Sequence, residues 1–217
     1  RSLAVRIFAK AQRLEEEGNY GAAKLEYVEV TLHEPGFEGI DAAIARMERE
    51  LQSQELRRLA EGVIPRGDYD AVDELLDEAF ELTSLEKGRI SELRAVNRKA
   101  RWSTRYERVR DLEVQGEFEL AIAGYKEILQ EWPEGFEDAE VRISGLEEGL
   151  EAAAQSYGEA QKAEEDGKLE AARAAYATAD LLLPGYKDAA DQAIRLERKL
   201  KADALKEAAP APVGDNP

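Results

Sequence analysis

Residues 109–136, VRDLEVQGEFELAIAGYKEILQEWPEGF, hold the pattern that decides the fold. In this stretch Gly116 is followed by apolar residues two, five, nine and twelve positions later, and three other glycines stand in the same frame. The four anchor glycines are Gly18, Gly67, Gly116 and Gly167, which are 49, 49 and 51 residues apart. Self-similarity at a fixed spacing of this size indicates a repeat array. The sequence therefore predicts four copies of one helical unit.

The apolar residues after each glycine recur with helical spacing, so they share one face of a helix. Copy by copy they are Tyr20, Ala23, Tyr27 and Val30; Tyr69, Val72, Leu76 and Ala79; Phe118, Ala121, Tyr125 and Ile128; and Leu169, Ala172, Tyr176 and Ala179. We interpret the recurring tyrosines as packing residues. Each anchor glycine should turn the chain between two helices through a positive φ, which glycine adopts without strain.

The helix after each glycine ends at a proline in three copies, because proline cannot donate a backbone hydrogen bond. The stop reads PGF at 35–37, PEGF at 133–136 and PGY at 184–186, whereas the second copy has LTSL at 82–85. A narrow apolar seam with spacings of 4, 3 and 4 follows the stop in the same three copies. In the imperfect seam of the second copy, Asn97 is interpreted as a residue that fixes register.

The segment between each seam and the next anchor glycine has two interpretations. No proline or glycine interrupts residues 42–60 or 90–114, which favours one long helix. The apolar face of that helix rotates midway, so its two ends would pack against different neighbours. A break in the middle, giving three helices per copy, is the alternative.

With continuous long helices, the chain is all-α, with about nine antiparallel helices that are alternately long and short. The expected helices cover residues 2–17, 19–33, 39–63, 68–82, 87–114, 117–131, 137–165, 168–182 and 187–208. We expect repeats at roughly 1–37, 38–86, 87–136 and 137–186 and a C-terminal capping helix over 187–208. Residues 210–217, rich in proline, are expected to form a disordered tail.

The offsets within each copy resemble those of the tetratricopeptide repeat. The fourth copy has Ala160, Gly167, Ala172, Tyr176, Ala179 and Pro184 in that family's spacing; the first and third copies match well, and the second matches least. The family's period is 34 residues, whereas this chain repeats about every 49 residues, so each copy has extra helix after the stop. The resemblance implies a single right-handed TPR-like α-solenoid over residues 1–209 that acts as a protein-interaction scaffold, and it implies no chemistry.

The composition narrows the classes of function. A formal net charge of −17 repels nucleic acid and anionic membranes and attracts a basic partner. The chain has no cysteine, which excludes disulfides and thiolate chemistry. No apolar run approaches the length of a membrane span, so we expect no membrane insertion by this segment. Because the chain starts with Arg1, we expect a soluble portion of a larger bacterial-type protein, with the cytoplasm and the periplasm both open as compartments.

Catalytic signals are weak. The single histidine, His33, stands at a predicted helix end, where it is interpreted as a C-terminal cap. Carboxylates occur as solvated runs such as residues 15–17 and 164–166, and no phosphate-binding loop, nucleophile elbow or metal-binding motif is present. We therefore expect no catalytic residues, metal ion or cofactor, and no enzymatic activity.

The candidate binding site is a basic stretch in an acidic chain. Its arginines step by 4, 3, 4 and 3 residues, so they line one side of a helix, and two aromatic residues lie nearby. The candidate partner-binding residues are Arg94, Arg98, Arg101, Trp102, Arg105, Tyr106 and Arg108. Arginine pairs with carboxylate or phosphate groups through two parallel hydrogen bonds, so the stripe could grip an acidic segment or an anionic polymer. The alternative is internal pairing with acidic neighbours, among them Asp73 and Asp77.

Together these features predict a non-catalytic scaffold for protein–protein interaction, which displays a surface to a protein partner whose identity the sequence does not specify. Two alternatives belong to other classes: a structural element that self-associates into homo-oligomers, and a binder of an anionic polymer through the Arg94–Arg108 stripe. Nucleic acid is not an expected partner.

Overall fold

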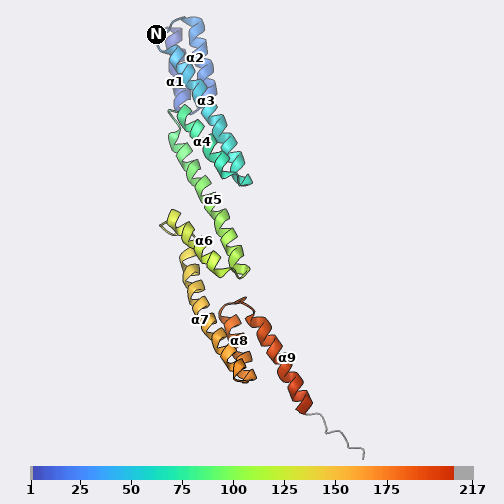
Figure 1. Cartoon of the computed structure of the whole chain (residues 1–217). Coiled ribbons are helices and arrows are strands. Elements are labelled where there is room, and N and C mark those ends of the chain that lie inside the picture. The colour runs from blue at the N-terminus through green and yellow to red at the C-terminus, as the bar shows by residue number, and fades with distance from the viewer. Residues whose placement is uncertain (1, 208–217) are drawn as a thin grey trace, which may run out of the picture. The chain divides into compact units, whose positions relative to one another are not determined.

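The computed structural model describes residues 2–207, and all the regular structure in that range is helical (Figure 1). Its elements are α1 (Leu3–Glu16), α2 (Tyr20–His33), α3 (Ile40–Val63), the 3-10 turn η1 (Ile64–Arg66), α4 (Tyr69–Leu82), α5 (Lys87–Val114), α6 (Phe118–Glu131), α7 (Ala139–Glu165), α8 (Leu169–Leu182) and α9 (Ala189–Glu207). Within residues 2–207 the prediction of an all-α chain with nine helices is confirmed. The predicted tail at 210–217 lies outside the described residues, as does Ala208 at the end of the predicted capping helix.

The four anchor glycines all turn the chain in the left-handed region, as predicted. Their φ angles are 75° at Gly18, 78° at Gly67, 81° at Gly116 and 74° at Gly167. A short helix begins two residues after each glycine and is 14 residues long in every copy. The repeat is therefore a repeat of structure as well as of sequence.

The long helices are continuous, so the alternative of a break in each copy is wrong. They are 24 residues long in α3, 28 in α5 and 27 in α7. The two halves of α3 pack into different hydrophobic cores, because the buried face of the helix rotates along its length. Ile40 and Met47 pack with α1 and α2, whereas Ala60 packs with α4 and the start of α5.

The chain divides into two compact units, residues 1–104 and 105–217, and the boundary falls inside α5. The first unit holds the first and second copies and the start of the third, and the second unit holds the rest of the third copy and the fourth. Corresponding anchor glycines are 98 residues apart between the first and third copies and 100 apart between the second and fourth. The stacking of all four copies into one right-handed solenoid stays a prediction.

A hydrogen-bonded triad recurs in the cores of both units. In the first copy, the buried Tyr27 donates to Glu15 Oε2 at 2.6 Å, and Arg46 Nε donates to Glu15 Oε1 at 2.7 Å. The third copy repeats the triad with Tyr125, Glu113 and Arg142, and the fourth with Tyr176, Glu164 and Arg195. Each triad joins the helix before the anchor glycine to the two helices after it, which confirms the tyrosines as packing residues.

The second copy lacks this triad, since Ile64 and Leu76 occupy the positions of the glutamate and the tyrosine. Leu76 is fully buried in an apolar cluster. The second copy is thus the irregular one in structure, as it is in sequence.

Candidate functional site

The predicted arginine stripe lies on α5, and three of its members are engaged in ion pairs. Arg101 Nη2 lies 2.9 Å from Asp70 Oδ1 and 2.8 Å from Asp73 Oδ2 on α4. Arg94 pairs with Asp77, also on α4. Farther along α5, Arg105 pairs with Glu127 of α6. The internal-pairing alternative is confirmed for these three arginines. Asp73 and Asp77 are among the acidic residues that the sequence indicated, whereas Asp70 and Glu127 are not.

The other predicted members of the stripe differ in accessibility. Arg98 and Arg108 are exposed, and Trp102 is half-buried. Tyr106 is only 6% exposed, and its ring packs 5.5 Å from that of Tyr125 between ring centroids. Its hydroxyl donates to Asp138, so Tyr106 belongs to the core of the second unit and offers little surface to a partner.

Asn97 joins two helices in the first unit. Its Nδ2 donates to the Tyr69 carbonyl oxygen at 3.0 Å and to Asp73 Oδ1 at 2.7 Å, and the side chain is buried. A buried polar residue with these partners favours one register of α5 against α4, which agrees with the interpretation from sequence.

A second candidate site surrounds Glu86, where the second copy departs from its own repeat. Nineteen residues after the anchor glycine, the first copy has Phe37 and the fourth has Tyr186, but the second has Glu86. Glu86 is as buried as the aromatic residue it replaces, with 7% of its surface exposed against 8% for Tyr186. A carboxylate at this depth needs hydrogen-bond donors around it.

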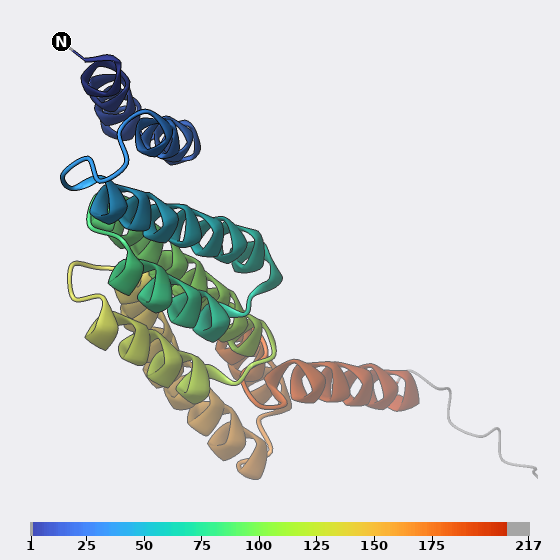
Figure 2. The ribbon, with the colours of Figure 1, turned by 90° about the horizontal axis from the view of Figure 1, so that it is seen from above.

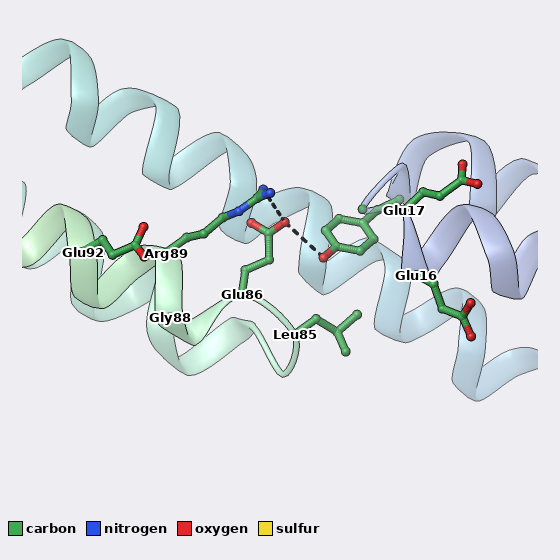
Figure 3. A pocket seen from close by; sticks show the side chains of 9 residues that line it. Glu16, Glu17, Leu85, Glu86, Gly88, Arg89 and Glu92 are labelled. Carbon is green, nitrogen blue, oxygen red and sulfur yellow. Dashed lines mark hydrogen bonds and ion pairs between the residues drawn. The ribbon is translucent and has the colours of Figure 1, made fainter.

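Four donors from three helices supply those hydrogen bonds, and Figure 3 shows the one from Arg89. Tyr20 Oη of α2 donates to Glu86 Oε1 at 3.1 Å, and Arg89 Nη1 of α5 reaches the same oxygen at 3.1 Å. From α3, Arg57 pairs with Oε2, and Gln54 Nε2 lies 3.4 Å from Oε1. Burial and the neighbouring Glu86 charge raise the pKa of Tyr20 to about 12, so its hydroxyl remains a donor at neutral pH.

A second buried carboxylate, Glu50, organises the loop that lacks a proline. Glu50 is 1% exposed and accepts from the Thr83 hydroxyl at 2.5 Å and from the Ser84 backbone N–H at 2.7 Å. The Thr83 hydroxyl oxygen in turn accepts from the backbone N–H groups of Leu85 at 3.2 Å and Glu86 at 2.9 Å. Side-chain hydrogen bonds therefore do here what the Pro-Gly turn does in the other copies.

The fourth copy has leucine and tyrosine side chains in the equivalent corner. At an offset of 100 residues, Glu50, Arg57, Thr83 and Glu86 correspond to Leu150, Tyr157, Leu183 and Tyr186. Burying charges is costly and is often no more stabilising than apolar packing of similar volume. A sequence that breaks its own local pattern at such a cost is expected to do so at functional or strained sites.

An open groove of about 380 Å³ lies over this polar corner and is lined by α1, α2, the α4–α5 loop and α5. Figure 3 shows Glu16 and Glu17 on one side of Glu86 and Glu92 on the other. A second groove of about 370 Å³ shares Arg89 and Glu92 with the first and adds Arg57, Glu61, Leu93 and Val96. The two grooves adjoin along the N-terminal half of α5.

The charge of the first groove is unbalanced. Glu86 is compensated by Arg57 and Arg89. Glu16, Glu17 and Glu92 are exposed, and within residues 2–207 they form no ion pair. The groove therefore presents an excess of negative charge, which suits a cationic side chain.

Sequence reasoning on the arginine stripe missed this site. A signal was present, since Glu86 stands where the first and fourth copies have an aromatic residue, and the third copy has Phe136 one position later. The partners of Glu86 could not be read in this way, because Tyr20 lies 66 residues away in the chain.

Other site types find little support in the described part of the chain. Residues 2–207 contain no cluster of histidine, aspartate or glutamate arranged to hold a metal ion. None of the helices in that range combines the length and the apolar character needed to cross a membrane. His33 is the last residue of α2, and its Nε2 lies 3.7 Å from Glu29.

No family model, curated protein or solved structure matches the chain. The likeness to the tetratricopeptide repeat therefore stays a prediction, which depends on the offsets within each copy.

Proposed function

We propose that this chain is a non-catalytic protein-interaction module of the TPR-like solenoid type, and that its groove beside Glu86 binds a basic segment of a protein partner. The observation that carries the proposal is that the second copy buries two carboxylates, Glu50 and Glu86, where the fourth copy has Leu150 and Tyr186, and that Glu86 lines an acidic groove. Its origin in a larger bacterial-type protein stays a prediction.

The negative charge of the protein favours a basic partner both at long range and within the groove. The chain as a whole has a formal net charge of −17, which steers a cationic partner toward it. At close range, Glu16 at the end of α1 and Glu17 just after it would attract cationic side chains of the segment on one side of Glu86, and Glu92 on α5 would do so on the other side. Complementary charges of this kind set the partner choice and the association rate more than the affinity.

Apolar contacts along the same groove suit a segment rather than a free cation. Leu85 is 48% exposed at the first groove, and Val96 is 53% exposed at the second. A peptide with basic and apolar side chains would cover both residues and remove apolar surface from water.

The test is the binding of a fluorescently labelled peptide that contains lysine and leucine, followed by fluorescence anisotropy. The double variant Glu17→Gln plus Glu92→Gln should weaken binding roughly three- to tenfold, because each exposed ion pair contributes about 0.2–1 kcal/mol. Both side chains are exposed and without ion pairs in the described residues, so the fold should be kept.

The matched control is Glu119→Gln plus Glu151→Gln, which makes the same charge change in the corresponding groove of the second unit. That groove of about 410 Å³ is lined by Phe118 and Tyr186 in place of Tyr20 and Glu86. Equal weakening by the two double variants would mean that binding follows net charge alone, and the proposed site would be wrong.

The arginine stripe is the weaker candidate. Arg94, Arg101 and Arg105 already form ion pairs within the chain, so an acidic partner would have to displace the carboxylates that bind them. The proposal for an anionic polymer then depends on Arg108, which is exposed on α5.

A further inference from the structure

Helix α2 is apolar on two opposite faces. Its inner face, with Tyr20, Ala23, Tyr27 and Val30, is buried against α1 and α3. Its outer face carries Leu25, which is 72% exposed, Leu32, which is 76% exposed, and Val28, which is 39% exposed. A helix that is apolar all round is usually covered on both sides.

The repeat itself does not require this outer face to be apolar. At the same offsets of 7, 10 and 14 residues after the anchor glycine, the other copies have Glu74, Asp77 and Glu81; Ala123, Lys126 and Gln130; and Ala174, Ala177 and Leu181. Only the first copy places three large apolar side chains there. The apolar stripe is thus a property of α2, and not of the fold.

The spacing of the stripe fits a second helix. Leu25, Val28 and Leu32 are three and four residues apart, which is the spacing of a coiled-coil seam. Lys24 and Glu29 flank the seam on its two sides. In a parallel pair of helices, a residue at the position of Lys24 faces the residue five positions later in the other helix. Lys24 of one copy would therefore face Glu29 of the other, and this happens twice in a symmetric pair.

We infer that the outer face of α2 is a self-association surface, which pairs in parallel with α2 of a second copy of this chain. The self-complementary charge pattern of Lys24 and Glu29 beside the apolar stripe commits the surface to this occupant. A symmetric pair of this kind has a twofold axis and closes on itself. Lys24 Nζ lies 2.9 Å from Glu48 on α3, and the Lys24 side chain is 34% exposed. In the pair, its ammonium group would lie between Glu48 of its own chain and Glu29 of the other copy.

The interface is small, since each copy contributes one helix of 14 residues. Interfaces at the low end of the size range belong to weak and transient complexes. The pair should therefore form with rising concentration, and sedimentation velocity over roughly a hundredfold range of protein concentration should show a shift from monomer to dimer.

Leu32→Glu should abolish the dimer, because it places two carboxylates in the apolar seam. The matched control is Leu181→Glu in α8, which changes the residue at the same offset in the fourth copy with a similar exposure of 81%. The control should dimerise as the wild type does, and circular dichroism should show unchanged helix content in both variants. A wild type that stays monomeric at every concentration, or a dimer that Leu32→Glu leaves intact, would overturn the inference.

Charge exchange tests the parallel arrangement. Lys24→Glu should weaken the dimer at least tenfold, because two glutamates then face each other, and adding Glu29→Lys should restore it. Both variants lose the contact between Lys24 and Glu48, and the double variant also loses the contact between Glu29 and His33. Glu29→Lys alone is therefore the control, and it should weaken the dimer as Lys24→Glu does. Failure of the second change to restore the dimer would contradict the parallel pair.

Discussion

Single residues set the stability of this fold where they bring a carboxylate into the core. Glu15 illustrates the balance. Burial raises the pKa of its carboxyl group, but the hydrogen bonds from Arg46 and Tyr27 outweigh burial and hold that pKa below its usual value of 4.5. The charged form of Glu15 is therefore the one that the folded state favours.

This shift predicts how stability depends on pH. A carboxyl group whose pKa is depressed in the folded state stabilises it fully above the pKa of the unfolded chain, and the stabilisation is lost as pH falls through the folded-state value. We expect Glu15→Gln to lower the free energy of unfolding at neutral pH by about 1 kcal/mol and to flatten its fall below pH 4.5. Urea titrations of both proteins at several pH values measure this, and parallel acid limbs would contradict it.

Glu86 and Glu92 line the same groove, but replacing them should lower the stability of the fold by different amounts. Glu86→Ala leaves Arg57 and Tyr20 without their acceptor, and removal of one partner from a buried ion pair costs about 3–5 kcal/mol. Glu92→Ala removes an exposed side chain without an ion pair in the described residues, so it should change stability by less than about 0.5 kcal/mol. Chemical denaturation measures both values; a loss of under about 1 kcal/mol for Glu86→Ala would mean that the polar corner is solvated.

At the scale of helices, close packing is set by residues that lack a side chain. Gly124 of α6 faces Val109 of α5, and a Cβ atom added at Gly124 would lie 2.5 Å from Val109 Cγ2. Valine is stiff about its first side-chain torsion, so the two helices themselves would have to move apart. In Figure 2 the short helix α4 lies beside the long helix α3, which belongs to the same unit.

Gly124→Ala should therefore lower the free energy of unfolding by about 1–3 kcal/mol, as overpacking does elsewhere. Gly145→Ala in α7 is the control, because a Cβ atom there meets nothing within 4 Å. Alanine is the better helix former, so this control should be neutral or up to about 1 kcal/mol more stable. Thermal and urea denaturation of the two variants provide the comparison, and similar effects at both sites would contradict the packing argument.

For the whole molecule, the repeat allowed much of the fold to be predicted and little of the site. The four glycine turns, the short helices and the continuity of the long ones depend on contacts between residues near in sequence, so periodicity and turn chemistry indicate them. The same reasoning favoured a partner surface on α5, yet Arg94 and Arg101 pair with α4 and Tyr106 lies in a core. Sequence spacing places side chains on a helix face but does not show which face a neighbouring helix covers.

The chain's own pattern was enough to establish its helices, its turns and its division into copies, because each is a local consequence of residue type and spacing. The role of Glu86 required the packed structure, since its carboxylate is held by Tyr20, Arg57 and Arg89 from three helices. The same holds for the uncovered stripe on α2, because exposure depends on which neighbours arrive and not on the helix alone. Burial and contacts between residues distant in sequence are properties of the folded chain. In this protein they distinguish copies whose sequence patterns are similar.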